Sequence, residues 1–256
     1  SRKKAEFGVG IARMEDRYFQ TNIIDFSETK HDKSTYSIFG GSIVLEGSTL
    51  NARQFATQGS REKMAAQIFT GTEHFRSGAS KVTKDTPEPY KKVQSWLQVS
   101  YQNETYHKVS PKFTLGAYLE AYYSSRNFSN NYTATLMQAG EFTPTAHSKV
   151  TYNEAFRANQ YAGVGAMPIY QLSESFQLRG EFYGFVPIFP IKKDEYGQAY
   201  YGKAFTKFEY LGEISLVFQL SFGSISAYVN HYSSPSNDWN VGLTLGWQLF
   251  NSRFIE

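Results

Sequence analysis

The end of the chain alternates strictly between large apolar residues and small or polar ones. In "DWNVGLTLGWQLF", residues 238–250, every second residue is bulky and apolar, and Asn, Gly, Thr and Gln stand between them. Successive side chains leave opposite faces of a β-strand, so a period of two over more than ten residues predicts a strand with two different faces. The apolar face carries Trp239, Val241, Leu243, Leu245, Trp247 and Leu249.

Three further segments repeat this alternation: "KFTLGAYLEAYY" at 112–123, "SFQLRGEFYGFV" at 175–186 and "FEYLGEISLVFQL" at 208–220. Weaker versions lie at 5–13, 35–47, 92–101 and 224–232. In the last two of the strong segments, the apolar face holds Phe176, Leu178, Phe182, Phe208, Ile214, Leu216 and Phe218. The opposite face of these segments holds Arg179, Glu181, Glu209 and Glu213. The chain is therefore expected to be all-β.

The length of these segments separates a membrane protein from a soluble one. Strands of soluble proteins usually run about 5–6 residues, whereas a tilted strand that crosses a bilayer needs about 9–11. The second face is also rich in Gly, Ser, Thr, Gln and Tyr, as a packed or watery lumen would be. Every backbone polar group must find a partner in hydrocarbon, so a sheet there has to close on itself. We therefore predict a closed antiparallel transmembrane β-barrel of about 12–16 strands, with a soluble β-sandwich or a lipocalin-like barrel as the alternative.

Turn signals divide the chain between these strands. Short hairpin turns are expected at 15–17, 221–223 and 233–238, and longer solvent-facing loops at 27–34, 76–90 and 191–204. The alternation lapses over residues 124–157, which is too long for a turn. A connection of that length is usually functional or folded into a lumen.

Composition narrows the classes of function. The net charge is only +3, from 26 Lys and Arg against 23 Asp and Glu, and no basic stripe is present, so we expect no nucleic-acid partner. The absence of cysteine excludes disulfides, thiolate metal sites and Cys nucleophiles. The first residues lack the features of a signal peptide, so the chain is either mature or a piece of something longer.

Several stretches together resemble a known kind of barrel. They are "QIFTGTEHFRSG", the run "TPTAHSKVTYNEAFRANQYAGVGAMPIYQLSESFQLRGEFYGFVPI" and the closing "GLTLGWQLFNSRFIE". These stretches resemble the C-terminal, surface-antigen type outer-membrane barrel that follows patatin-like phospholipase domains in Gram-negative bacteria. The resemblance implies that residues 1–256 form one barrel domain in the outer membrane, and that a catalytic or passenger domain lies upstream of Ser1. It also implies that residues 124–157 are a long extracellular loop folded into the lumen.

One departure from that family concerns Arg157. Related assembly factors carry a Val-Arg-Gly-Phe or Val-Arg-Gly-Tyr motif in this loop, whereas this chain has "AFRAN". Arg157 could reach an acidic lumen residue such as Glu181, Glu209 or Glu213, because buried charges need partners. The alternative is that Arg157 is a solvated residue at a strand end.

The sequence holds no recognisable catalytic motif. The nucleophile elbow G-x-S-x-G of a patatin domain is absent; its nearest match, "GSIS" at 223–226, lies inside an alternating strand. The five His show no metal-ligand spacing, so we expect no metal and no other cofactor. The candidate polar lumen residues are Arg157, Arg179, Glu181, Glu209 and Glu213. The three carboxylates allow two interpretations. They could form an enzyme site in the barrel or, more simply, a polar network in the lumen.

These observations favour a membrane anchor or translocator for a patatin-like lipid hydrolase passenger. The alternatives are a passive pore or binding barrel, a subunit of a larger outer-membrane complex, and a barrel enzyme. The expected partners are outer-membrane lipids and the barrel insertion machinery, which would recognise the aromatic Phe254 near the C-terminus; a homodimer or larger outer-membrane assembly stays open.

Overall fold

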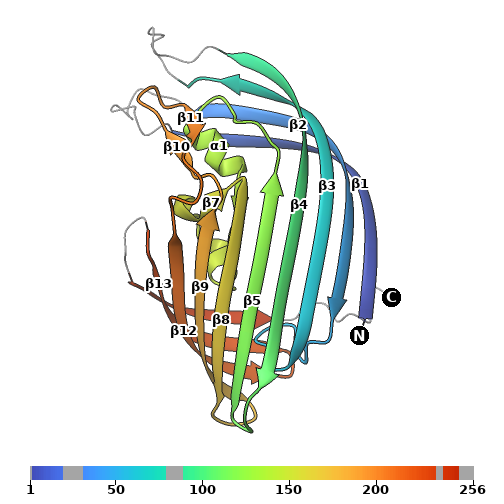
Figure 1. Ribbon diagram of the computed structural model, residues 1–256, viewed down its shortest axis with the longest axis vertical. Coiled ribbons are helices and arrows are strands. Elements are labelled where there is room, and N and C mark those ends of the chain that lie inside the picture. The colour runs from blue at the N-terminus through green and yellow to red at the C-terminus, as the bar shows by residue number, and fades with distance from the viewer. Residues whose placement is uncertain (1, 20–30, 79–88, 235–238, 248–256) are drawn as a thin grey trace.

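The computed structural model describes residues 2–19, 31–78, 89–234 and 239–247, and its main feature is one large, strongly curved antiparallel sheet (Figure 1). Ten strands follow one another in chain order across this sheet. They are β1 (Arg2–Tyr18), β2 (Asp32–Ser48), β3 (Gly59–Arg76), β4 (Tyr90–Lys108), β5 (Phe113–Ser124), β8 (Gln160–Gln171), β9 (Phe176–Pro187), β12 (Glu209–Leu220), β13 (Gly223–Tyr232) and β14 (Trp239–Trp247).

The all-β prediction is confirmed; within the described residues the main sheet has ten strands, fewer than the 12–16 expected for a barrel wall. The first four strands run 17–19 residues, so fewer strands fill the same length of chain. Residues 15–17, which we expected to form a turn, continue β1 to Tyr18, because they pair with residues 33–35 at the beginning of β2 and Lys33 lies 2.5 Å from Glu15. The expected turn at 221–223 is present between β12 and β13. Four residues of the expected turn at 233–238, half of the loop at 27–34 and most of the loop at 76–90 lie outside the described residues. Residues 32–34 of the first loop belong to β2.

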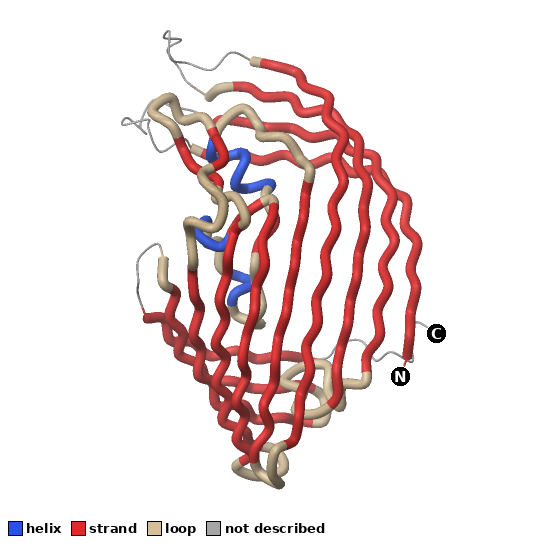
Figure 2. Tube along the Cα trace, viewed as in Figure 1, coloured by secondary structure: helices blue, strands red, loops and turns tan. Residues whose placement is uncertain are grey.

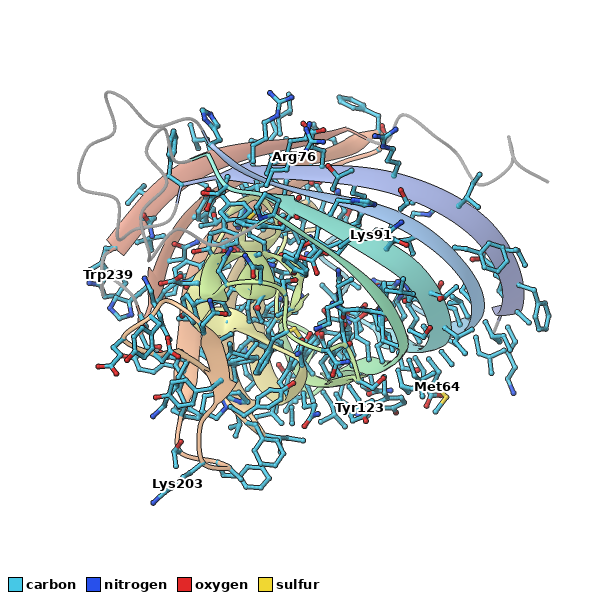
Figure 3. The ribbon with its side chains drawn as sticks, turned by 90° about the horizontal axis from the view of Figure 1, so that it is seen from above. Met64, Arg76, Lys91, Tyr123, Lys203 and Trp239 are labelled. Carbon is cyan, nitrogen blue, oxygen red and sulfur yellow. The ribbon has the colours of Figure 1, made fainter. Side chains whose placement is uncertain are left out.

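The two faces of the sheet differ as the alternation predicts. Along β12 the even-numbered residues from Tyr210 to Leu216 face outward or are half-buried, and the odd-numbered residues from Glu209 to Val217 are buried. The residues of β9 alternate in the same way, with Leu178 outward and Arg179 inward. Seen from above, the strands curve around a filled interior, and Met64, Tyr123 and Trp239 lie on the outside of the curve (Figure 3). The convex face is apolar and the concave face is mixed and polar.

The segment between β5 and β8, residues 125–159, lies inside the curve of the sheet (Figure 2). We call this segment the insertion. It contains α1 (Tyr132–Gln138), β6 (Gly140–Glu141), the 3-10 turns Ser148–Val150 and Glu154–Phe156, and β7 (Arg157–Ala158). The side chain of Asn131 caps α1 by accepting a hydrogen bond from the amide of Ala134, 2.9 Å away. The ends of the insertion meet, because the amide of Ser124 donates to the carbonyl of Asn159 at 2.6 Å.

A second segment enters the interior from the opposite end of the strands. It joins β2 to β3, and we call residues 49–58 the inward loop. Phe55 in this loop adopts a left-handed backbone with φ of 53°, which is unfavourable for a residue with a side chain. Its neighbours hold it there, since Gln177 and Gln219 both donate to the carbonyl of Phe55.

Aromatic residues form most of the core between the insertion and the sheet. Phe142 and Phe156 of the insertion contact the ring of Phe185 on β9, with centroids 5.5 and 5.6 Å apart. The same cluster contains Tyr106, Tyr118, Tyr161, Tyr183, Tyr232, Met167, Ile169 and Leu211. A small hairpin of β10 (Ile191–Lys193) and β11 (Ala199–Tyr201), within the expected loop at 191–204, covers α1 at the end of the interior.

The two edges of the main sheet are β1 and β14, and no pairing joins them within the described part of the chain. Most side chains of β1 are exposed on both faces, whereas from Val241 to Gly246 the residues of β14 alternate between exposed and half-buried. Among the described residues, no helix has the length and apolar character needed to cross a bilayer.

Candidate functional site: a polar network inside the curved sheet

The four charged residues that the alternation assigned to the inner face are all buried there. Arg179 and Glu181 lie on β9, and Glu209 and Glu213 lie on β12, each with 7% or less of its surface exposed. The register brings two of them side by side, because Glu181 pairs with Glu213 across the two strands. Charges at this depth need hydrogen-bonding partners to offset the loss of water.

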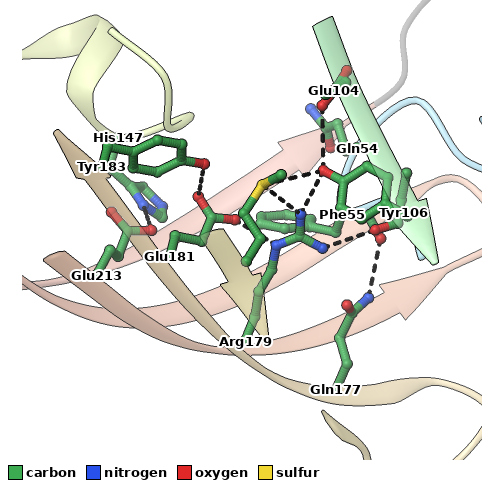
Figure 4. Close-up of polar contacts among 12 residues, drawn as sticks. Gln54, Phe55, Glu104, Tyr106, His147, Gln177, Arg179, Glu181, Tyr183 and Glu213 are labelled. Carbon is green, nitrogen blue, oxygen red and sulfur yellow. Dashed lines mark hydrogen bonds and ion pairs between the residues drawn. The ribbon is translucent and has the colours of Figure 1, made fainter. Parts of the chain in front are cut away.

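Arg179 is the centre of the network (Figure 4). Its Nε donates to Oε1 of Glu181, its Nη1 donates to the carbonyl of Ala56 at 2.9 Å, and its Nη2 donates to the hydroxyl of Tyr106 at 2.8 Å. The second oxygen of Glu181 accepts a hydrogen bond from Tyr183 at 3.0 Å. One guanidinium thus ties β9 to β4 and to the inward loop.

Glu213 pairs with a histidine of the insertion. Nδ1 of His147 lies 2.6 Å from Oε1 of Glu213, and Asn230 donates to the other oxygen at 3.4 Å. The imidazole also stacks on the ring of Tyr228, with centroids 3.5 Å apart. His147 is 4% exposed, so this contact fixes the middle of the insertion against β12 and β13.

Glu209 lies nearer the end of its strand and has two partners. The hydroxyl of Ser233 donates to Oε2, and Nζ of Lys207 lies 3.3 Å from Oε1. Lys207 also donates to the carbonyl of Ala155 in the insertion at 3.2 Å. All three carboxylates therefore have protein donors. Because a catalytic carboxylate must reach its substrate, this arrangement favours a structural network over an enzyme site.

Arg157 does not reach Glu181, Glu209 or Glu213, and it is not solvated either. Its Nη2 lies 2.7 Å from Oε2 of Glu141, and 10% of its side chain is exposed. Its Nη1 donates to three carbonyls at the end of α1, those of Leu136, Met137 and Ala139. Helix ends leave carbonyls without intrahelical partners. Arg157 binds these carbonyls and Glu141, so all of these partners lie within the insertion and not on the main sheet.

A second buried cation, Arg126, holds the other end of the insertion, and the sequence pattern did not indicate it. Its guanidinium lies 4.6 Å from the ring of Trp96 and 5.1 Å from that of Tyr36. Its Nη1 donates to Gln138 at 2.7 Å, and Gln138 donates to Asp16 on β1 at 2.5 Å. Burial lowers the pKa of the Arg126 guanidinium from its ordinary value, while nearby Tyr36 and Glu73 favour its charged form.

The residues that the alternation assigned to the apolar face of the strands point outward where the structure describes their side chains. Exposed fractions run from 39% for Phe176 to 82% for Val241. The outward set comprises Phe176, Leu178, Phe182, Phe208, Ile214, Leu216, Trp239, Val241, Leu243 and Leu245, with Phe218 half-buried at the end of β12. The side chain of Trp247 and all of Leu249 and Phe254 lie outside the described residues.

Within the described ranges, no three His, Asp or Glu side chains gather as metal ligands would. Comparison of the chain with protein-family models, curated proteins and solved structures finds no match.

The network makes one prediction about stability. Replacing Arg179 by Met removes the cation and leaves Glu181 buried without its charge partner. We expect this variant to lose about 3–5 kcal/mol in free energy of unfolding, because breaking one side of a buried pair is more costly than removing both. Urea unfolding followed by tryptophan fluorescence measures the loss.

Two companion variants make the result specific. The double variant Arg179→Met with Glu181→Gln should recover part of the loss. Arg61→Met breaks a half-exposed pair with Glu46, and should cost only about 0–1 kcal/mol. Equal losses for Arg179→Met and Arg61→Met would contradict the central role of Arg179.

Proposed function

We propose that this chain is the wall and filled interior of a transmembrane β-barrel that anchors a protein in a bacterial outer membrane. The observation that carries the proposal is the inverted distribution of residues, in which the exposed face is apolar and the buried face holds the charges. One outward row crosses six paired strands without a charged residue. In strand order it is Phe113, Tyr170, Leu178, Leu216, Ala227 and Leu243.

Water is a poor solvent for this convex face. Soluble monomers rarely expose a contiguous apolar patch larger than a few hundred Å², and here β5, β8, β9, β12, β13 and β14 of the main sheet all contribute exposed apolar side chains. A bilayer solvates such a surface. Strands β5, β8, β9 and β12 have 12 residues each, enough for a tilted strand to cross.

A membrane location also requires the two edges of the sheet to find partners. Each unpaired backbone group in hydrocarbon costs several kcal/mol. The main sheet has ten antiparallel strands, an even number, so β1 and β14 run in opposite directions. Closure by pairing β1 with β14 would thus continue the antiparallel order, as in bacterial outer-membrane barrels.

The filled interior favours an anchor over a passive pore. The insertion and the inward loop enter from opposite ends, and both bond to the polar network around Arg179 and Glu213. A conducting lumen needs a continuous water path, and these segments occupy it. An anchor needs only a stable wall.

The remaining parts of the proposal rest on the resemblance of the sequence to surface-antigen barrels. They are a patatin-like lipid hydrolase upstream as the passenger, insertion by the barrel insertion machinery, and contact with outer-membrane lipids. Antibody labelling of intact and permeabilised cells, with separation of inner and outer membranes, tests this location.

A lysine on the convex face tests whether that face meets lipid. Leu216 lies near the middle of β12, next to Leu178. In lipid vesicles, Leu216→Lys should lose about 2–4 kcal/mol in free energy of unfolding, as charges at the bilayer midplane do. Val109→Lys, in the exposed turn between β4 and β5, is the control and should stay within about 0.5 kcal/mol. A neutral effect of Leu216→Lys would mean that this face meets water.

Cysteine pairs test closure, since the natural chain has no cysteine. We expect Val9→Cys on β1 to form a disulfide within one chain with a cysteine at 241, 243 or 245 on β14. Geometry allows a disulfide only between close Cα atoms, so one of the three partners should dominate. Val9→Cys with Ile225→Cys, one strand further in, is the control. Crosslinks found only between two chains would show that the sheet does not close on itself.

Conductance across planar bilayers tests whether the interior is blocked. The natural chain should show no steady current. Replacing residues 126–157 with a short Gly-Asn turn is feasible because Ser124 and Asn159 are hydrogen-bonded, and this variant should conduct. Removing 194–198 at the tip of the β10–β11 hairpin is the control and should leave the barrel closed to ions. Steady current through the natural chain would support the pore instead of the anchor.

A further inference from the structure

The convex face is not smooth: it contains a hollow of about 790 Å³ over β8, β9, β12, β13 and β14. We call it the outer groove. Its volume lies within the range of small-molecule sites, about 300–1,000 Å³. Most of its lining is apolar and comes from outward side chains. The residues that shape it are Phe182, Gly184, Phe208, Gly212, Ile214 and Trp239.

Two glycines create the hollow. Gly184 and Gly212 occupy outward positions where neighbouring strands carry large side chains. A Cβ added at Gly212 would meet only the ring of Phe182, at 3.6 Å, so the space above it is open. The ring of Phe208 packs against Gly184, 3.0 Å from the place of a Cβ there, and forms one wall of the hollow. The open floor is the bare backbone at Gly212.

The polar groups of the outer groove gather at one end. Tyr210, His231 and Trp239 lie where β12 begins, β13 ends and β14 begins. The rings of Tyr210 and His231 are 5.8 Å apart and stacked, and those of His231 and Trp239 are 4.8 Å apart. A phenol, an imidazole and an indole can each donate a hydrogen bond. Aromatic residues of this kind are typical of the boundary between hydrocarbon and headgroups.

We infer that the outer groove binds one membrane phospholipid, with an acyl chain over Gly212 between the rings of Phe182 and Phe208, and with the phosphate at the Tyr210, His231 and Trp239 end. This inference rests on the proposed membrane location. The occupant must be apolar along most of its length and must accept hydrogen bonds at one end, which is the chemistry of a phospholipid. The outer groove is also continuous with the face that the proposal places in acyl chains.

Fluorescence of Trp239 reports on this site directly. The chain has three tryptophans, and Trp96 is buried on the inner face, away from lipid. In a Trp247→Phe background, the protein is inserted into phosphatidylcholine vesicles that contain a rising minor fraction of phosphatidylcholine with brominated acyl chains. A bound lipid predicts quenching that saturates at a low brominated fraction, whereas random contact predicts quenching proportional to that fraction.

A filled groove supplies the matched comparison. Gly212→Leu places a side chain in the hollow and should abolish the saturating quenching. Gly41→Leu adds the same side chain on the outward face of β2, where a Cβ would meet only the carbonyl of Gly8 at 3.7 Å, and should leave it unchanged. Identical, proportional quenching in all three proteins would overturn the site, as would a second copy of the chain that shields Trp239 in the vesicles.

Two further readouts separate the parts of the inference. Flotation with vesicles shows insertion independently, so a chain that inserts without saturable quenching disproves only the site, whereas failure to float disproves the membrane proposal as well. Brominated diacylglycerol, which lacks the phosphate, should fail to saturate the site in the natural chain. His231→Phe should reduce the difference between the two lipids, and equal saturation by both in the natural chain would overturn the phosphate contact.

Discussion

The structure depends on one constraint: a sheet with an apolar convex face must enclose its charges and satisfy them from within. Alternation places Arg179 and Glu213 on the inner side of their strands, and it places Leu178 and Ile214 on the outer side. Desolvated charges are unfavourable unless they are paired and hydrogen-bonded. The interior therefore cannot be left as bare wall, and two segments outside the main sheet supply the missing partners. The inward loop gives Arg179 a carbonyl acceptor, and the insertion gives Glu213 an imidazole.

The same constraint explains why the insertion is ordered. Its apolar residues, such as Leu136, Phe142 and Phe156, are buried only against other parts of the chain, and its short helix would be marginal in isolation. Its contacts with the wall are instead distributed along its length: Arg126 against Trp96 near the beginning, His147 against Glu213 in the middle, and Phe156 against Phe185 near the end. Each contact joins the insertion to a different strand, so the insertion braces the wall as much as the wall orders the insertion.

The sequence predicted the faces of the best-patterned strands and missed most of what lies between them. Periodicity alone assigned Glu181 inward and Phe182 outward, because a strand has only two faces. It found only parts of the long strands β1, β2 and β4, where glycines such as Gly40 and Gly41 interrupt the alternation, and it did not indicate β3. It also gave no sign of the partner of Arg157 or of the left-handed Phe55, since both depend on contacts between residues far apart in the chain. Nothing local distinguishes the inward loop from an ordinary turn.

The filled interior and the outer groove lie on opposite faces of the same stretch of β9 and β12. On β9 the inward residues on either side of Gly184 are Tyr183 and Phe185, both buried among the aromatic rings of the core. On β12 the inward neighbours of Gly212 are Leu211 and Glu213, equally buried. Large side chains therefore face inward at the level where the insertion packs. At the same level, the outward positions Gly184 and Gly212 carry no side chain. A close-packed interior needs large side chains there to contact the insertion, whereas on the convex face a Cβ at Gly212 would meet only the ring of Phe182, at 3.6 Å. Gly184 leaves room for the ring of Phe208, which would lie 3.0 Å from a Cβ there. Gly212 has no such neighbour, so its missing side chain keeps the outer groove open, and in the proposed lipid site this opening is what admits an acyl chain.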